Sequence, residues 1–167
     1  MFILQKLLIS CINLGEYVEL YSDKNDLTKF IFGKIVFCDD SHIIILSITP
    51  EGMYDGYILK RIEDIVKICT RTNYIADMIS KIDQSSLKQF VFNNSDSSIV
   101  GLLDFAKTNN LIVSIELLNS GYSEAFGFVN EINNNYIAIK QIDQSDKLDG
   151  ITYVRNEDIT QISMDSV

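Results

Sequence analysis

The sequence contains no tryptophan, a single proline and a single histidine, and it is poor in basic residues. With 1 Pro and 8 Gly in 167 residues, and with 47% hydrophobic residues, it does not have the composition of a disordered chain. Its 14 basic residues are outnumbered by 23 acidic ones, which gives a net charge of −9. Nucleic acid and anionic membranes need Lys and Arg to displace their counterions, so both are unfavourable partners.

Cysteine and long apolar runs are scarce as well. The three cysteines, Cys11, Cys38 and Cys69, lie far apart among apolar neighbours, and they predict neither a disulfide framework nor a Cys-x-x-Cys site. The apolar stretch at residues 1–4 is interrupted by Lys6 and precedes no small-residue cleavage site, so we expect no signal peptide. No apolar run approaches the length of a membrane span. These features predict a cytoplasmic protein with reduced cysteines.

What the sequence does contain is an internal repeat. At an offset of 94 residues (127 − 33) the chain matches itself without a gap from Gly33 to Ile68, and upstream the offset becomes 95. A shared gap-free spacing over this length indicates a duplicated module. The clearest matches are Phe32-Gly33 with Phe126-Gly127, Asp55-Gly56 with Asp149-Gly150, and 61–65 with 155–159.

Each copy has the pattern of a helix followed by five strands. The helical faces lie at 4–12 and 99–106, with a further helix predicted between the copies at 72–83. The predicted strands are 16–22, 29–39, 42–49, 56–60 and 64–69 in the first copy, and 112–117, 124–132, 136–142, 151–154 and 158–163 in the second. The predicted fold class is therefore α+β, with two tandem small β-barrels, each preceded by a helix. We place the domains at 1–70 and 95–167, joined by a linker with a helix at 71–94.

Two glycines lie inside predicted strands, at Gly33 and Gly127. Glycine weakens pairing in a strand unless the strand must bend sharply. Closure of a small barrel needs such a bend, so both glycines favour barrels.

This pattern resembles the Sm-like family, within the wider group of SH3-like small barrels, over about residues 4–69 and 99–163. The matching motifs are Gly33-x-Ile35-x-x-Cys38-Asp39 leading to Leu46, then Ile58-Leu-Lys-Arg61, and Tyr153-Val-Arg155 in the second copy. The resemblance implies a helix and a five-stranded barrel in each copy.

The resemblance does not extend to the RNA-binding pocket of that family. The pocket uses an Asn in the loop after the Asp, and a Gly after the Arg. Here the Asn position is Ile43 or Ile137, and the Gly position is Ile62 or Asn156. The second copy also has Asn133 and Lys140 at the Asp and Leu positions. The missing pocket therefore counts against RNA binding.

Charged residues recur in both copies, as Arg61-x-Glu63-Asp64 and as Arg155-x-Glu157-Asp158. One interpretation is a binding surface that was duplicated with the fold. The other is a structural turn, in which the carboxylates cap backbone N–H groups and pair with the Arg, and we favour this one. Asp55-Gly56 and Asp149-Gly150 are predicted to be turns too, with Gly supplying a positive φ or permitting a close approach.

The sequence nominates no catalytic residue, cofactor site or metal site. His42 has neither a second His nor a Cys near it in sequence, and its counterpart is Tyr136. The acids Asp143, Asp146 and Asp149 do not follow a calcium-loop pattern. We therefore predict that the protein is not an enzyme.

The function that best fits these features is an acidic protein–protein interaction module. Residues 1–83 carry 9 basic and 12 acidic residues, whereas residues 84–167 carry 5 and 11, so the nets are −3 and −6. Asp143, Asp146 and Asp149 make the second copy the candidate surface for a basic protein partner, such as a toxin neutralised by an immunity-type inhibitor. The alternative is an Sm-like RNA-binding protein. Oligomerisation through barrel edges is a further use of the same scaffold.

Overall fold

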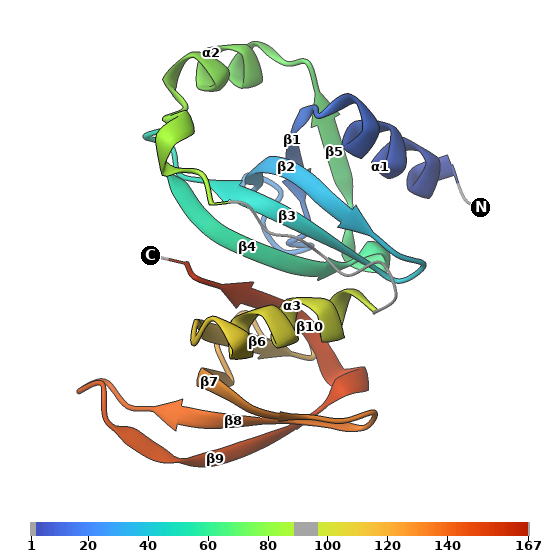
Figure 1. Cartoon of the computed structure of the whole chain (residues 1–167). Helices are drawn as coiled ribbons and strands as arrows, with labels where there is room; N and C mark the ends of the chain where they lie inside the picture. Colours follow the sequence, from blue (N-terminus) through green and yellow to red (C-terminus); the bar gives the residue numbers. More distant parts are fainter. Residues whose placement is uncertain (1–2, 89–96, 167) are drawn as a thin grey trace. The chain divides into compact units, whose positions relative to one another are not determined.

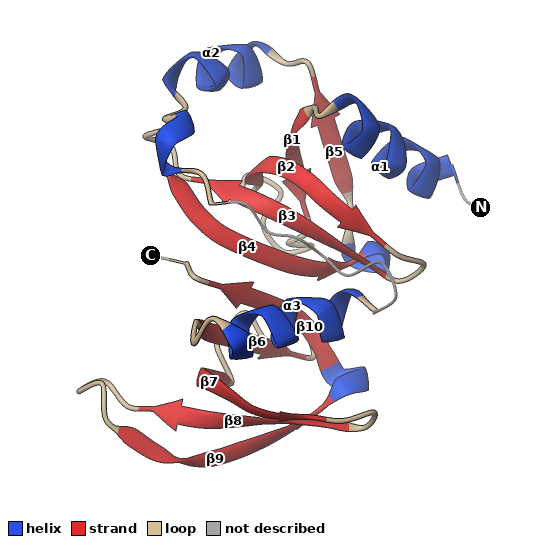
Figure 2. Cartoon of the chain, in the orientation of Figure 1, coloured by secondary structure: helices blue, strands red, loops and turns tan. Residues whose placement is uncertain are grey.

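The computed structural model describes residues 3–88 and 97–166, and it shows an α+β chain (Figures 1 and 2). The chain divides into two compact units, with the boundary between residues 91 and 92. No helix in the described part of the chain is long and apolar enough to cross a membrane.

The first unit contains the first copy and the helix that follows it. Its elements are α1 (Ile3–Leu14), β1 (Tyr17–Tyr21), β2 (Ile31–Cys38), β3 (His42–Ile48), β4 (Tyr54–Arg61), the 3-10 turn η1 (Ile62–Asp64), β5 (Lys67–Thr70), α2 (Asn73–Lys81) and the 3-10 turn η2 (Gln84–Ser86). The strands are antiparallel in the order β5-β1-β2-β3-β4. The helix predicted over 72–83 is α2, and Thr72 caps its first turn by accepting a hydrogen bond from the Ile75 N–H.

The second unit repeats this arrangement. Its elements are α3 (Ser98–Thr108), β6 (Ile112–Leu117), β7 (Ala125–Ile132), β8 (Tyr136–Ile142), β9 (Leu148–Arg155), the 3-10 turn η3 (Asn156–Asp158) and β10 (Ile159–Met164). The strand order β10-β6-β7-β8-β9 is that of the first unit, with β10 in the place of β5. Ser97 caps the first turn of α3 by accepting a hydrogen bond from the Val100 N–H.

The register of the strands repeats as well. Gly33 lies opposite Val18 and Ser47, and its counterpart Gly127 lies opposite Val113 and Gln141. The irregularities in the β2–β3 and β3–β4 ladders recur at the same places in the β7–β8 and β8–β9 ladders. A one-residue slip would invert the faces of a strand, so this agreement shows that both copies fold in one way.

Closure of each sheet into a barrel is not seen. In the described residues of the first unit, β5 and β4 are the two ends of the strand order and are not hydrogen-bonded neighbours. The same holds for β10 and β9 in the second unit. The coarse prediction of an α+β fold is therefore confirmed, while the sheets of the two units are open.

The strand glycines permit close approach of a neighbouring strand. A Cβ atom on Gly33 would lie 1.8 Å from the carbonyl oxygen of Leu46, and one on Gly127 would lie 1.9 Å from that of Lys140. No side chain tolerates such a distance to backbone. Glycine is thus required at both positions by the packing of β2 on β3 and of β7 on β8.

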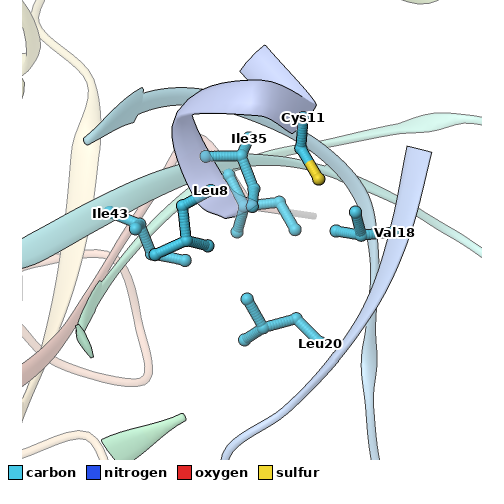
Figure 3. Close-up of a cluster of buried hydrophobic side chains, with 7 residues drawn as sticks. Leu8, Cys11, Val18, Leu20, Ile35 and Ile43 are labelled. Atoms are coloured by element: carbon cyan, nitrogen blue, oxygen red, sulfur yellow. The ribbon is translucent and has the colours of Figure 1, made fainter. Parts of the chain in front are cut away.

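The core of the first unit lies between α1 and the sheet. Figure 3 shows side chains from α1 and from three strands meeting there, and the helix contributes Leu8 and Cys11. Both helical residues are almost fully buried, at 0% and 1% exposure. The helix ends at Gly15, whose φ of +63° reverses the chain toward β1. The buried residues of this cluster are Leu8, Cys11, Val18, Leu20, Ile35, Ile43 and Ile45.

Candidate functional site

The repeated Arg motif forms the same ion pairs in both copies. At the junction of β4 and η1, Arg61 Nε lies 2.8 Å from Asp64 Oδ2, and Arg61 Nη1 lies 3.1 Å from Glu63. At the junction of β9 and η3, Arg155 Nε lies 2.7 Å from Asp158 and 3.2 Å from Glu157. The pairs raise the pKa of Arg155, first through its hydrogen bond to Asp158. Each guanidinium thus pairs with the two acids that follow it in its own copy.

The turn between the second and third strands is also built alike in the two copies. Asp39 Oδ1 accepts hydrogen bonds from the N–H groups of Ser41 and His42, at 2.8 and 2.6 Å. Asn133 Oδ1 accepts the equivalent pair in the second copy, at 3.0 Å from Asn135 N and 2.7 Å from Tyr136 N. Asp and Asn close this turn equally well because each provides a carbonyl-type acceptor.

The turn between the third and fourth strands has the same backbone geometry in both copies but different side chains. In the first copy the Thr49 carbonyl accepts from Gly52 N at 2.9 Å, and in the second the Asp143 carbonyl accepts from Asp146 N at 3.1 Å. Gly52 and Asp146 both have positive φ, at +87° and +59°. A neutral Thr and Gly in the first copy are therefore replaced by two aspartates, both exposed, in the second.

Asp143 also stabilises its own turn. Its Oδ1 atom accepts hydrogen bonds from Ser145 N at 2.7 Å and from Lys147 N at 3.0 Å. One carboxylate oxygen is engaged in this way, while the charge of the side chain remains at the exposed surface. A substitution at this position must therefore keep the acceptor if it is to test the charge alone.

The first-copy turn is covered by the end of α2. A Cβ atom on Gly52 would lie 2.3 Å from the carbonyl oxygen of Lys81, and the Gly52 carbonyl accepts a hydrogen bond from Asp83 N at 3.0 Å. No side chain larger than a hydrogen fits at Gly52. Asp146, the equivalent residue, is exposed.

The fourth strands of the two copies also differ in how exposed their side chains are. Tyr57 and Leu59 of β4 are 3% and 0% exposed. The matching residues of β9, Ile151 and Tyr153, are 47% and 63% exposed. Leu148, at the start of β9, is 69% exposed. The second copy therefore presents an apolar strand next to its acidic turn.

The Asp-Gly pairs lie inside these strands, and not in turns as predicted. Asp55 and Gly56 belong to β4, and Asp149 and Gly150 belong to β9. Between Leu46 and Ile48 of β3 the partner strand gains one residue, which is a β-bulge, and Gly56 has a φ of +77° there. Gly150 occupies the same bulge with a φ of +80°. A positive φ was one of the two roles predicted for these glycines, but their place in the fold was predicted wrongly.

Two of the three cysteines, Cys11 and Cys38, are not activated as nucleophiles. Burial, followed by the charges of Asp39 and Asp40, raises the pKa of Cys38 to about 11, and burial together with the Glu16 charge raises the pKa of Cys11. Both thiols are therefore protonated near neutral pH, whereas a nucleophilic cysteine needs a lowered pKa. Within the part of the chain that the structure describes, no three His, Cys, Asp or Glu residues are grouped to hold a metal ion.

Each unit has one shallow hollow whose lining is described. In the first unit a hollow of about 460 Å³ lies between β1 and α2, with the Glu16–Arg71 ion pair of 2.6 Å beside an apolar lining from Ile75 and Ile79. In the second unit a hollow of about 340 Å³ lies between the start of α3 and the turns at Asn133 and Asn156. The hydroxyl groups in both linings have structural roles: Thr72 donates a hydrogen bond to Glu19, and Ser97 accepts one from the Val100 N–H.

No protein-family model matches the chain, and no curated protein or solved structure matches it with significance.

Proposed function

We propose that this protein is a non-enzymatic, cytoplasmic interaction module that binds a basic protein through its second copy. The scaffold would be a tandem pair of Sm-like or SH3-like small barrels, used for protein recognition in place of RNA recognition. An immunity-type inhibitor or a regulatory binder of a basic protein fits this description.

One observation carries the proposal. The turn after the third strand keeps its hydrogen bonds in both copies, yet Gly52 is covered, whereas its counterpart Asp146 is charged and exposed. The segment 143–149 has three aspartates and one lysine, and its counterpart 49–55 has two acids, Glu51 and Asp55, and no basic residue. The two turns thus differ in where their acids lie, and the second belongs to the part of the chain whose net charge is −6. Loops can diverge on a retained scaffold without disturbing its core, and an acidic surface steers basic partners toward it.

The test is the association rate of a captured protein partner. Replacing Asp143 and Asp146 by Asn removes two charges but keeps the acceptor that closes the turn. We expect association to slow, dissociation to change less, and thermal stability to stay nearly constant. Raising the salt concentration should slow association of the unaltered chain in the same way.

The control is the pair Asp104→Asn and Glu131→Gln, two exposed acids of the same unit outside this turn. The proposal is wrong if only acidic proteins are captured, or if both double variants associate like the unaltered chain. Sub-micromolar binding of single-stranded RNA at about 50 mM salt would instead support the RNA-binding alternative, because low salt favours phosphate contacts.

A further inference from the structure

The chain itself shows how a fourth strand of this module is covered. In the first unit, residues 81–88, here called the covering segment, pass the start of β4. The N–H of Tyr54, the first residue of β4, donates a hydrogen bond of 3.2 Å to Ser86 Oγ. The Lys88 ammonium lies 5.3 Å from the centre of the Tyr54 ring. A backbone group of β4 and an aromatic face thus bind a segment that carries a lysine.

A second contact extends this cover along β4. The Tyr57 hydroxyl donates a hydrogen bond to the carbonyl oxygen of Lys88. Tyr57 is 3% exposed, whereas its equivalent Ile151 is 47% exposed. Among the described residues, no segment of the second unit makes the corresponding contacts with β9.

The strand β9 is open along its outer edge. Among the strands of its own unit that the structure describes, β9 pairs with β8 alone. Edges of this kind are normally protected by lysine, proline or a bulge. The bulge at Gly150 protects only the start of β9, and 151–155 pairs regularly with β8 and contains neither Pro nor Lys. Five regular residues with exposed Ile151 and Tyr153 are a surface for an added strand.

The acidic turn determines which segment fits. Asp146 replaces the glycine that the α2 end approaches in the first copy, so a close backbone cover of that kind is excluded there. A charged carboxylate in an interface needs a cation or several donors beside it. A second copy of this chain is a poor occupant because its own net charge is −9.

We propose that β9 binds an extended segment of a partner protein as an added antiparallel or parallel strand, with its Lys or Arg side chains next to Asp143, Asp146 and Asp149. The proposal rests on the function proposed above and specifies how that partner is held. Apolar side chains of the segment would alternate with basic ones and pack on Ile151 and Tyr153.

The probe is an acetylated and amidated eight-residue peptide that alternates valine with lysine, titrated into the full ¹⁵N-labelled chain. Chemical-shift changes should concentrate on 143–155. The variant Tyr153→Lys puts a like charge on the edge and should weaken binding about tenfold. The matched control is Tyr122→Lys, at a tyrosine of the same unit that is 76% exposed, compared with 63% for Tyr153. This control should leave affinity unchanged.

Two further peptides test the strand and the charge separately. Methylation of alternate backbone nitrogens removes the N–H groups that an added strand needs, and should weaken binding about tenfold. A valine–glutamate peptide of equal length should bind weaker than the lysine peptide by at least about tenfold. Equal binding of the methylated peptide, or equal losses in both tyrosine variants, would overturn strand addition.

The outcomes separate this inference from the proposed function. If the Asp143→Asn and Asp146→Asn double variant weakens lysine-peptide binding while Tyr153→Lys and methylation do not, the acidic surface stands and the added strand is wrong. If lysine and glutamate peptides bind alike, both proposals are wrong. Self-association of the chain that Tyr153→Lys abolishes would assign β9 to a second copy, and would also overturn the inference.

Discussion

The two copies have one strand order and one register, yet they differ in what lies over the fourth strand. In the first copy the end of α2 and the covering segment lie against Gly52 and Tyr54. In the second copy the same positions, Asp146 and Leu148, are exposed. The residues agree with this difference: a glycine lies where the backbone of Lys81 approaches, and an aspartate lies at the exposed equivalent position. Among the described residues, the start of the fourth strand is thus covered in the first copy and exposed in the second.

The largest expected effect comes from the strand glycines, which both copies need. Gly33→Ala and Gly127→Ala should each destabilise their own unit by about 3 kcal/mol, because the new methyl group would overlap a backbone carbonyl. Hydrogen exchange resolved by mass spectrometry would locate the loss in the altered unit. The control is Gly150→Ala. A Cβ atom at Gly150 would have no atom within 4 Å, so only the φ of +80° opposes this substitution. That control should cost about 1 kcal/mol.

Equal losses at Gly33, Gly127 and Gly150 would contradict this expectation. Such a result would mean that backbone conformation, and not the close approach of the next strand, determines the need for glycine in β2 and β7.

An exchange between the copies should have the next largest effect. Gly52→Asp places a side chain where the Lys81 carbonyl lies 2.3 Å away, so we expect α2 to be displaced and the first unit to lose about 2 kcal/mol. The reciprocal Asp146→Gly meets no such obstacle and should change stability by less than about 1 kcal/mol. Limited proteolysis within the covering segment would report the displacement. Unchanged proteolysis of Gly52→Asp would show that the cover does not depend on this contact.

The repeat made much of the fold predictable from sequence. The offset of 94 residues placed Gly33 and Gly127 at equivalent sites, and the structure gives them equivalent neighbours. A gap-free match carries register information, because a strand slipped by one residue would expose its core face. The α+β class and the helix α2 could be predicted from the spacing of apolar residues along the chain.

Other features depend on contacts that no local pattern encodes. Asp-Gly was predicted as a turn, but a Gly with positive φ serves a bulge equally well, and only pairing with β3 decides between them. Tyr57 and Ile151 are both apolar residues in a strand, so their different exposure could not be read from sequence. The cover over the first copy was missed because it depends on how α2 ends against Gly52.

The candidate acids were only partly predictable. Their number could be read from the sequence. The role of Asp143 in closing its turn could not, because it depends on hydrogen bonds from the backbone N–H groups of Ser145 and Lys147. Asp149 was grouped with them as a turn residue and instead begins the bulge of β9. For this reason the charge test uses Asp143 and Asp146, which flank the turn, and leaves Asp149 in place.

The smallest expected effect concerns pH, and it again compares equivalent positions. Burial lowers the pKa of His42, with Arg61 acting in the same direction and Asp39 opposing it. A histidine whose folded pKa lies below its unfolded value of 6.5 disfavours folding when protonated. The neutral histidine therefore makes its full contribution to the stability of the folded state above pH 6.5. This contribution is lost as the pH falls from 6.5 toward the lower pKa of the folded state. The first unit should be less stable at about pH 5.5 than at about pH 7.5 for this reason.

Exchanging the residues at positions 42 and 136 separates the contribution of the histidine from that of the carboxylates, because both variants keep every carboxylate. His42→Tyr introduces the second-copy residue and should flatten the pH dependence of hydrogen exchange in the first unit. Tyr136→His places a histidine at a site that is 47% exposed, where burial is slight, and should add little pH dependence to the second unit. An unchanged profile in His42→Tyr would assign the acid sensitivity to carboxylates such as Asp39, which faces His42 at 3.8 Å. The half-buried histidine would then be a packing residue only, equivalent in role to the tyrosine that replaces it.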